Sequence, residues 1–200
     1  MTTKPVLGLI GGIGAGKSAA AAGLAALGAG VIDCDKLGHA VLETPPVVRQ
    51  LTARWGGEIL RSDGGIDRRA VAGIVFADPA ERLALEAILF PAIGARAAEA
   101  VVAARSDPAV RFAVLDAAVL LEAGWHDACT RIVYIDAPRD VRLHRLHARG
   151  GWTDADLTAR EAAQWPAGRK KAAADAVVEN VGSIADLYAR LGSLVTGWGW

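Results

Sequence analysis

Short apolar runs that end on glycine or aspartate alternate along this chain with longer segments of helix-forming residues. The first run, Pro5–Ile10, leads into a glycine-rich turn, and the stretch from Ser18 to Leu27 is almost entirely alanine and leucine. A short apolar run bounded by glycines predicts a buried strand, whereas alanine and leucine favour a helix. The chain is therefore expected to start as strand, turn and helix.

The same kind of apolar run returns four times, followed each time by polar residues. Strands are expected at Val31–Ile32, Arg111–Asp116, Arg131–Asp136 and Ala176–Val178, and a closing helix at Ile184–Val195. Strands that alternate with helices and carry carboxylates at their ends are typical of a doubly wound parallel α/β sheet. Ligands bind at the carboxyl ends of the strands in such a fold.

Between the second and third of these strands, about residues 36–108, the pattern is helical. Thr44–Pro46 predicts a break before the next helix. Helices are expected from Arg69 to Ala104, with interruptions at Ala77–Pro79 and again at Phe90–Pro91, because proline disrupts a helix interior. This insertion suggests a substrate-holding subdomain inside a single domain of 200 residues.

Three arginines recur at a spacing of three and four residues, which places Arg142, Arg145 and Arg149 on one face of a helix. An ordinary solvated face is one interpretation. In a nucleotide-binding protein, a cluster of guanidinium groups can instead clamp a phosphoryl group in transit. With Gly150–Gly151 as a hinge, residues of about 145–170 are a candidate lid.

The turn after the first strand, Gly11–Ser18, matches the phosphate-binding pattern G-x-x-x-x-G-K-[ST] without a mismatch. Glycines allow its backbone N–H groups to point into one concavity, and the following helix adds its positive dipole end. Lys17 should contact the outer phosphates, and the Ser18 hydroxyl should hold Mg²⁺. The residues expected to bind the nucleotide here are Gly12, Gly14, Ala15, Gly16, Lys17, Ser18 and Ala19.

Carboxylates follow two of the expected strands. Asp33 and Asp35 come after Val31–Ile32, on the rim where a doubly wound sheet binds ligands, although a role as helix caps is an alternative for one of them. Asp116 ends an apolar strand in the manner of a Walker B carboxylate and is expected near Mg²⁺.

Composition narrows the class of partner. Basic and acidic residues number 22 each, so no excess charge argues for nucleic acid or a membrane surface. The apolar stretch Val6–Ile32 carries Lys17 near its centre and is dense in glycine, which favours burial in a soluble protein over a membrane span. Two distant cysteines, Cys34 and Cys129, in a chain without an export signal indicate reduced thiols and a cytoplasmic protein.

Together these pieces resemble the dephospho-CoA kinase family, over about Val6 to Leu194. The matching segments are Gly8–Ser18, Val31–Asp35, Asp63–Arg68, Leu85–Ile88 and Leu120–Glu122, joined by Arg145, Arg149, Gln164, Ala174–Asp175 and Asn180. The glycine loop is shared by many kinases, whereas its combination with Val-Ile-Asp-x-Asp and the Asp63–Arg68 turn is much narrower.

The resemblance implies a P-loop kinase fold and transfer of the γ-phosphate of ATP to the 3′-hydroxyl of dephospho-CoA, with Mg²⁺, in a monomer or small homo-oligomer. Asp35 would orient or deprotonate that hydroxyl. Arg68 and Leu120 would lie on the acceptor side, and Asn180 near the adenine. The implied catalytic residues are Lys17, Asp35, Arg145 and Arg149.

Two departures from the family pattern lie on the acceptor side. The family usually has His-Pro where this chain has Phe90-Pro91, and the segment Asp116–Glu122 lacks the proline that usually follows its aspartate. A related kinase for another nucleoside or nucleotide hydroxyl therefore remains an alternative. A nucleotide-binding regulator without catalysis is another, although the absence of Asn-Lys-x-Asp argues against a guanine-specific switch.

Overall fold

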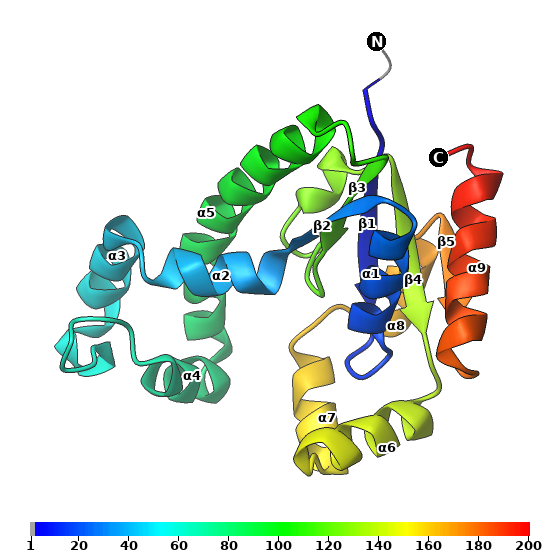
Figure 1. Ribbon diagram of the computed structural model, residues 1–200. Helices are drawn as coiled ribbons and strands as arrows, with labels where there is room; N and C mark the ends of the chain where they lie inside the picture. Colours follow the sequence, from blue (N-terminus) through cyan, green and yellow to red (C-terminus); the bar gives the residue numbers. More distant parts are fainter. Residues whose placement is uncertain (1–2) are drawn as a thin grey trace. The chain divides into compact units, whose positions relative to one another are not determined.

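Five parallel strands form one sheet in the order β2-β3-β1-β4-β5 (Figure 1). The computed structural model describes residues 3–200. The strands are β1 Val6–Gly11, β2 Ala29–Asp33, β3 Phe112–Asp116, β4 Arg131–Asp136 and β5 Ala176–Glu179. All six residues of β1 are buried between β3 and β4. A continuous apolar run is what a strand covered on both faces requires.

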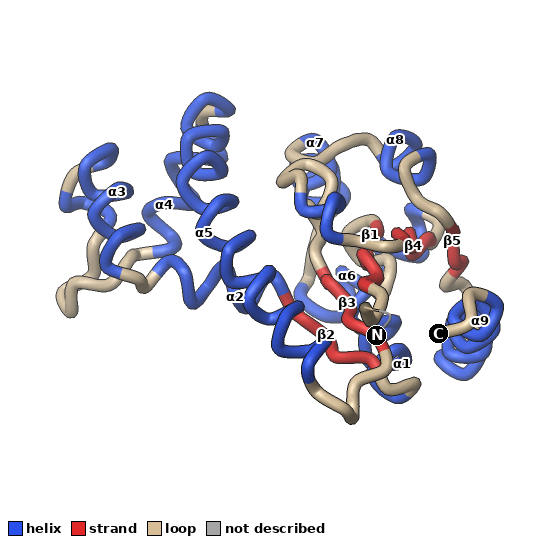
Figure 2. The backbone as a smooth tube through the Cα atoms, turned by 90° about the horizontal axis from the view of Figure 1, so that it is seen from above, coloured by secondary structure: helices blue, strands red, loops and turns tan. Residues whose placement is uncertain are grey.

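Helices cover both faces of this sheet. Their bounds are α1 Lys17–Ala26, α6 Arg139–Gly150, α7 Asp154–Ala162, α8 Ala167–Ala172 and α9 Ile184–Gly197, with a 3₁₀ turn η2 at Trp125–Ala128. Figure 2 shows α1 and α9 on one side of the strands and α8 on the other. Capping boxes at Thr153 and Ser183 satisfy the first N–H groups of α7 and α9 and so fix where these helices begin.

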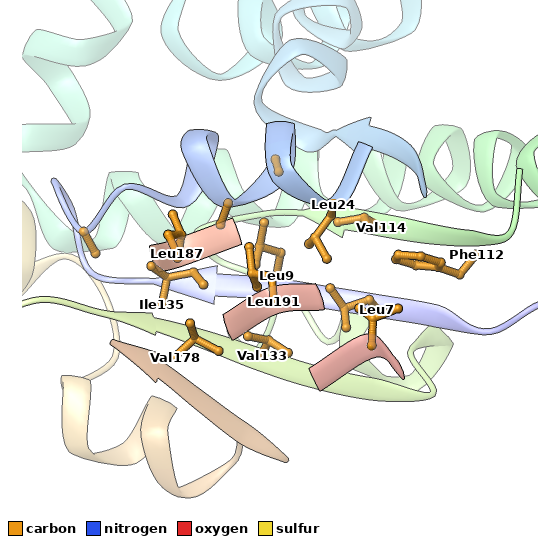
Figure 3. Packing of buried hydrophobic residues seen from close by; sticks show 14 of the residues in the cluster. Leu7, Leu9, Leu24, Phe112, Val114, Val133, Ile135, Val178, Leu187 and Leu191 are labelled. Carbon is orange, nitrogen blue, oxygen red and sulfur yellow. The ribbon is translucent and has the colours of Figure 1, made fainter. Parts of the chain in front are cut away.

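The main hydrophobic core lies between the sheet and the pair α1 and α9 (Figure 3). Leu7 and Leu9 of β1 are fully buried there against Leu191 of α9. The chain's last residues extend this core, because the Trp200 ring lies 5.8 Å from that of Phe112, centroid to centroid. The tryptophan-rich tail is therefore part of the packing.

Residues Cys34–Glu99 form a second compact unit with its own core. It contains α2 Cys34–Leu42, α3 Pro45–Trp55, the 3₁₀ turn η1 Gly57–Ile59, α4 Arg68–Ala77 and most of α5 Pro79–Ser106. Val47, Leu51 and Ile59 are almost completely buried within it. This unit gives the sheet no strand.

The expected strands, the doubly wound fold and the helix break at Ala77–Pro79 are confirmed, but the expected break at Phe90–Pro91 is wrong. Helix α5 runs through Pro91 without the expected break. A proline inside a helix costs roughly 3 kcal/mol. Ile93 and Ala97 of the same helix are buried, and apolar burial is the kind of term that opposes such a cost. Pro45 and Pro46 open α3, where the missing N–H has no intrahelical partner to lose. Asp35 lies in the first turn of α2, while β2 already ends at Asp33.

The apolar stretch Val6–Ile32 forms β1, the glycine loop, α1 and most of β2, and not one spanning helix. By length and composition alone, α5 is long and apolar enough to cross a membrane, with 17% of its most apolar window buried. A single helix of this kind does not assign a protein to a membrane, since helices of soluble proteins meet the same criteria.

Candidate active site

The carboxyl edge of the sheet brings the loop after β1 beside the end of β3. In the strand register, Leu9 of β1 lies opposite Asp116 of β3, and Asp116 lies opposite Asp33 at the end of β2. The chain leaves β1 at Gly11 and enters the glycine loop on this edge. Ligands of doubly wound sheets bind at this position, so it is the candidate active site.

The glycine loop presents backbone donors. Gly14 and Gly16 have φ of 78° and 93°, the left-handed region that favours glycine. The Ala15 N–H donates to the Gly12 carbonyl at 3.0 Å, whereas within residues 3–200 the N–H groups of Gly14 and Gly16 donate to no backbone carbonyl. The first N–H groups of α1, which starts at Lys17, also lack intrahelical acceptors. Such a concentration of donors at a helix start binds phosphate.

Lys17 and Asp116 form an ion pair at the mouth of this loop, with side chains 16% and 10% exposed. Ser18, the next residue, is exposed on the first turn of α1. A hydroxyl and a carboxylate fit Mg²⁺, which takes one or two protein oxygens and completes its shell with phosphate and water. Within residues 3–200, no group of three or more His, Cys, Asp and Glu side chains could hold a metal ion by itself.

Helix α6 holds the loop from outside through two arginines. The Arg142 Nη1 donates to the Ile13 carbonyl at 3.0 Å, and the Arg145 Nη1 donates to the Ala15 carbonyl at 3.4 Å. Arg149 is exposed near the end of the same helix. The spacing of the arginines predicts the shared face but not its contact with the loop backbone, and Arg142 binds that backbone instead of facing the phosphate. The phosphate-binding roles of Arg145 and Arg149 stay predictions.

Asn180 is buried against the same loop. Its side-chain amide donates to the Ala15 carbonyl at 2.8 Å, and its own carbonyl accepts from the Arg145 Nη2 at 2.9 Å. Its backbone N–H donates to the carbonyl of Asp136 at 2.7 Å. Asn180 thus joins the loop to the end of β4, and its expected contact with adenine stays a prediction.

A cavity of about 260 Å³ opens beside the loop. Gly12 and Ile13 line one side, and Tyr134, Trp165 and Lys170 line others. Burial, together with the nearby Asp136 carboxylate, raises the pKa of the Tyr134 phenol above its ordinary value.

A buried ammonium group holds the segment before α8. Lys170 is 2% exposed and donates to the Ala118 carbonyl at 2.7 Å and to the Gln164 side chain at 3.1 Å. It also pairs with the Glu122 carboxylate at 2.8 Å, and that carboxylate accepts a hydrogen bond from the backbone N–H of Trp165. The loop after β3 is therefore fastened to the residues between α7 and α8. Sequence periodicity gave no sign of this contact.

The three residues expected on the acceptor side have different surroundings. In the second unit, Asp35 is exposed on the first turn of α2, and Arg68 at the start of α4 lies 2.8 Å from the His39 ring, Nη2 to Nε2. Leu120 is fully buried, close to Gly8 of β1. Direct contact of the Leu120 side chain with a substrate would require it to leave the core, so its main observed role is packing.

A sequence model of the dephospho-CoA kinase family matches residues 5–186. A protein of Anaeromyxobacter dehalogenans named dephospho-CoA kinase is 44% identical over 181 residues, which cover 89% of this chain and 84% of that protein.

Solved structures agree with the fold. The crystal structure of a Thermus thermophilus protein superposes with a TM-score of 0.82 at 32% identity, covering 98% of both chains. The structure of dephospho-CoA kinase from Campylobacter jejuni superposes with a TM-score of 0.69 at 22% identity, covering 96% of this chain and 95% of that one, and it supports the fold alone.

Proposed function

The chain belongs to the dephospho-CoA kinase family, and on this premise we propose that it phosphorylates the ribose 3′-hydroxyl of dephospho-CoA with ATP, the last step of coenzyme A synthesis. The observation that carries the proposal is the glycine loop with its unpaired N–H groups at the carboxyl edge of β1. Family membership supplies the acceptor, and the loop supplies the phosphate-binding chemistry.

The nucleotide side of the reaction uses residues 12–19. The loop N–H groups and the Lys17 ammonium bind the β- and γ-phosphates of ATP, and the backbone of Ala19 reaches the α-phosphate. Lys17, which pairs with Asp116 in the structure, turns to the phosphates when ATP binds. Mg²⁺ bound by Ser18 and Asp116 would supply charge neutralisation between the phosphates.

On the acceptor side, Asp35 takes the proton of the 3′-hydroxyl. The oxygen of that hydroxyl forms the new bond to the γ-phosphorus, the bond between this phosphorus and the β,γ-bridging oxygen breaks, and ADP leaves with the electron pair. Arg68 binds the acceptor. Arg145 and Arg149 neutralise charge on the transferred group as residues of about 145–170 close, because phosphoryl transfer depends mainly on positioning and charge stabilisation.

A competition assay tests the proposal. Purified protein is given ATP and Mg²⁺ with dephospho-CoA, adenosine or phosphopantetheine, and ADP release is followed by a coupled assay. Of the three acceptors, we expect only dephospho-CoA to support ADP release, and mass spectrometry should identify the 3′-phosphorylated product. Turnover with several hydroxyl acceptors would favour a broader kinase, and ATP binding without turnover would favour a regulator. We also propose a cytoplasmic enzyme whose partners are these small molecules.

A further inference from the structure

Each of the three guanidinium nitrogens of Arg142 binds an oxygen atom of the protein, and the side chain is only 11% exposed. Its Nε donates to the Ala137 carbonyl at 3.1 Å, and its Nη1 donates to the Ile13 carbonyl at 3.0 Å. Its Nη2 pairs with the Glu161 carboxylate of α7 at 2.7 Å. One side chain therefore joins the glycine loop, the start of α6 and the end of α7.

The hydrogen bond from Arg142 to Ile13 orients one peptide group of the glycine loop. The peptide between Ile13 and Gly14 is trans, so its C=O and N–H groups point in opposite directions. Arg142 holds the carbonyl on the side of α6 and thereby turns the Gly14 N–H away from that helix. A Cβ on Gly12 would lie 3.3 Å from the Arg142 guanidinium, so the guanidinium lies directly against the loop.

The bond to Glu161 extends this contact to α7. Glu161 divides its carboxylate between two arginines: Oε1 faces Arg142, and Oε2 faces Arg139 at 3.3 Å. Arg139 also binds Asp154 and Thr158 of α7, but among the described residues it makes no hydrogen bond or ion pair with the glycine loop. Arg139 and Arg142 of α6 thus both hold α7, and of these two residues Arg142 also holds the glycine loop.

We propose that Arg142 is a positioning residue that couples the order of α7 to nucleotide binding at the glycine loop. Nucleotide that fixes the loop peptides steadies Arg142 and, through Glu161, the end of α7. By thermodynamic reciprocity, an anchored α7 raises the affinity of the loop for nucleotide by the same factor. This inference rests on the proposed nucleotide-binding function of the loop.

Hydrogen exchange measured by mass spectrometry tests the coupling in the full chain. The probe is a non-hydrolysable ATP analogue with Mg²⁺ at saturating concentration, added to wild type, Arg142→Met and Arg139→Met. In wild type and Arg139→Met, the analogue should slow exchange in peptides covering both residues 12–18 and 154–162. In Arg142→Met it should slow exchange in the loop alone.

Kinetics add a second readout. Arg142→Met should raise the KM for ATP about tenfold with the KM for dephospho-CoA unchanged, as expected for one charge-assisted hydrogen bond. Arg142→Lys, which can reach only one of the two partners, should keep the folding of wild type without restoring coupling. Should Arg142→Met misfold, Arg142→Lys carries the exchange test.

Protection of 154–162 by the analogue in Arg142→Met, or its loss in Arg139→Met as well, would overturn the proposal. Failure of wild type to phosphorylate dephospho-CoA would contradict the proposed function instead, and the exchange experiment does not depend on that reaction.

Discussion

The carbonyl oxygen of Ala15 accepts a hydrogen bond from the side-chain amide of Asn180 at 2.8 Å, across 165 positions of the sequence. The same carbonyl accepts from Arg145. Two groups from distant segments therefore hold one peptide of the glycine loop, and the loop is shaped before any nucleotide reaches it. Preorganised donors of this kind contribute most to phosphoryl transfer, because they need no reorganisation during the reaction.

Gly16→Ala tests how tightly this part of the loop is packed. The residue has φ of 93°, and a Cβ there would collide with the Asn180 amide nitrogen. Calorimetric titration with a non-hydrolysable ATP analogue should show affinity at least about tenfold weaker, since left-handed backbone alone costs ~1–2 kcal/mol with a side chain. Gly168→Ala, in α8, is the matched control: an added Cβ there would meet no other part of the protein within 4 Å, so this variant should bind as wild type does.

Lys17→Met removes the ammonium group expected to stabilise the transferring phosphate. The kcat for ADP formation should fall roughly 10²–10³-fold, the usual effect of losing one such donor. Circular dichroism should show an unchanged fold, because Lys17 contributes its charge at the mouth of the loop and not to the core. Turnover within threefold of wild type would remove Lys17 from the mechanism.

Asp35→Asn distinguishes a role toward the acceptor from a role toward the metal. A general base contributes about 10²–10⁴-fold to the rate, so kcat should fall within that range while ATP affinity, measured by titration, stays as in wild type. A parallel loss of ATP and Mg²⁺ affinity would instead place Asp35 among the groups that bind the metal.

Lys170→Met tests the buried ion pair with Glu122. The ammonium is almost completely buried and satisfied by three acceptors. Its removal leaves a carboxylate that is 12% exposed without its charge partner, which should lower the free energy of unfolding by about 3–5 kcal/mol in urea denaturation. Lys171→Met is the neighbouring control: its pair with Asp136 is exposed at 39% and 26%, so about 0–1 kcal/mol is expected.

Burial raises the pKa of the Cys129 thiol from 9.0 to about 12. The native thiol therefore keeps its proton at pH values where the unfolded thiol has lost it, so the free energy of unfolding should decline as pH rises from about 9 to about 12. Urea titrations across this range should show a shallower decline in Cys129→Ala. An identical pH slope in both proteins would contradict the assignment. At pH 8 the thiol should react with iodoacetamide only after unfolding, because the thiolate is the nucleophile.

The sheet could be predicted because each buried strand is a short apolar run with its own end signals, as in Arg131–Asp136, whose bounds the structure reproduces. The phosphate loop could be placed for a similar reason, since its glycines and Lys17 are adjacent in sequence. Local rules failed where packing outweighed them: helix α5 continues through Pro91, which proline chemistry alone would not allow.

Contacts between segments that lie far apart in the chain could not be predicted from the sequence. The spacing of Arg142 and Arg145 shows that they share a helix face, but it does not show which acceptors that face meets. Nor does any periodicity connect Lys170 to Glu122. These contacts depend on the path of the chain after β3 and after α6, and the spacing of residues within one helix or strand does not determine that path.

The residues from Cys34 to Glu99 enter after β2, form their own core and return through α5 without giving a strand to the sheet. A block with its own buried residues and no strand in the sheet can change its sequence without altering the strand order that carries the glycine loop.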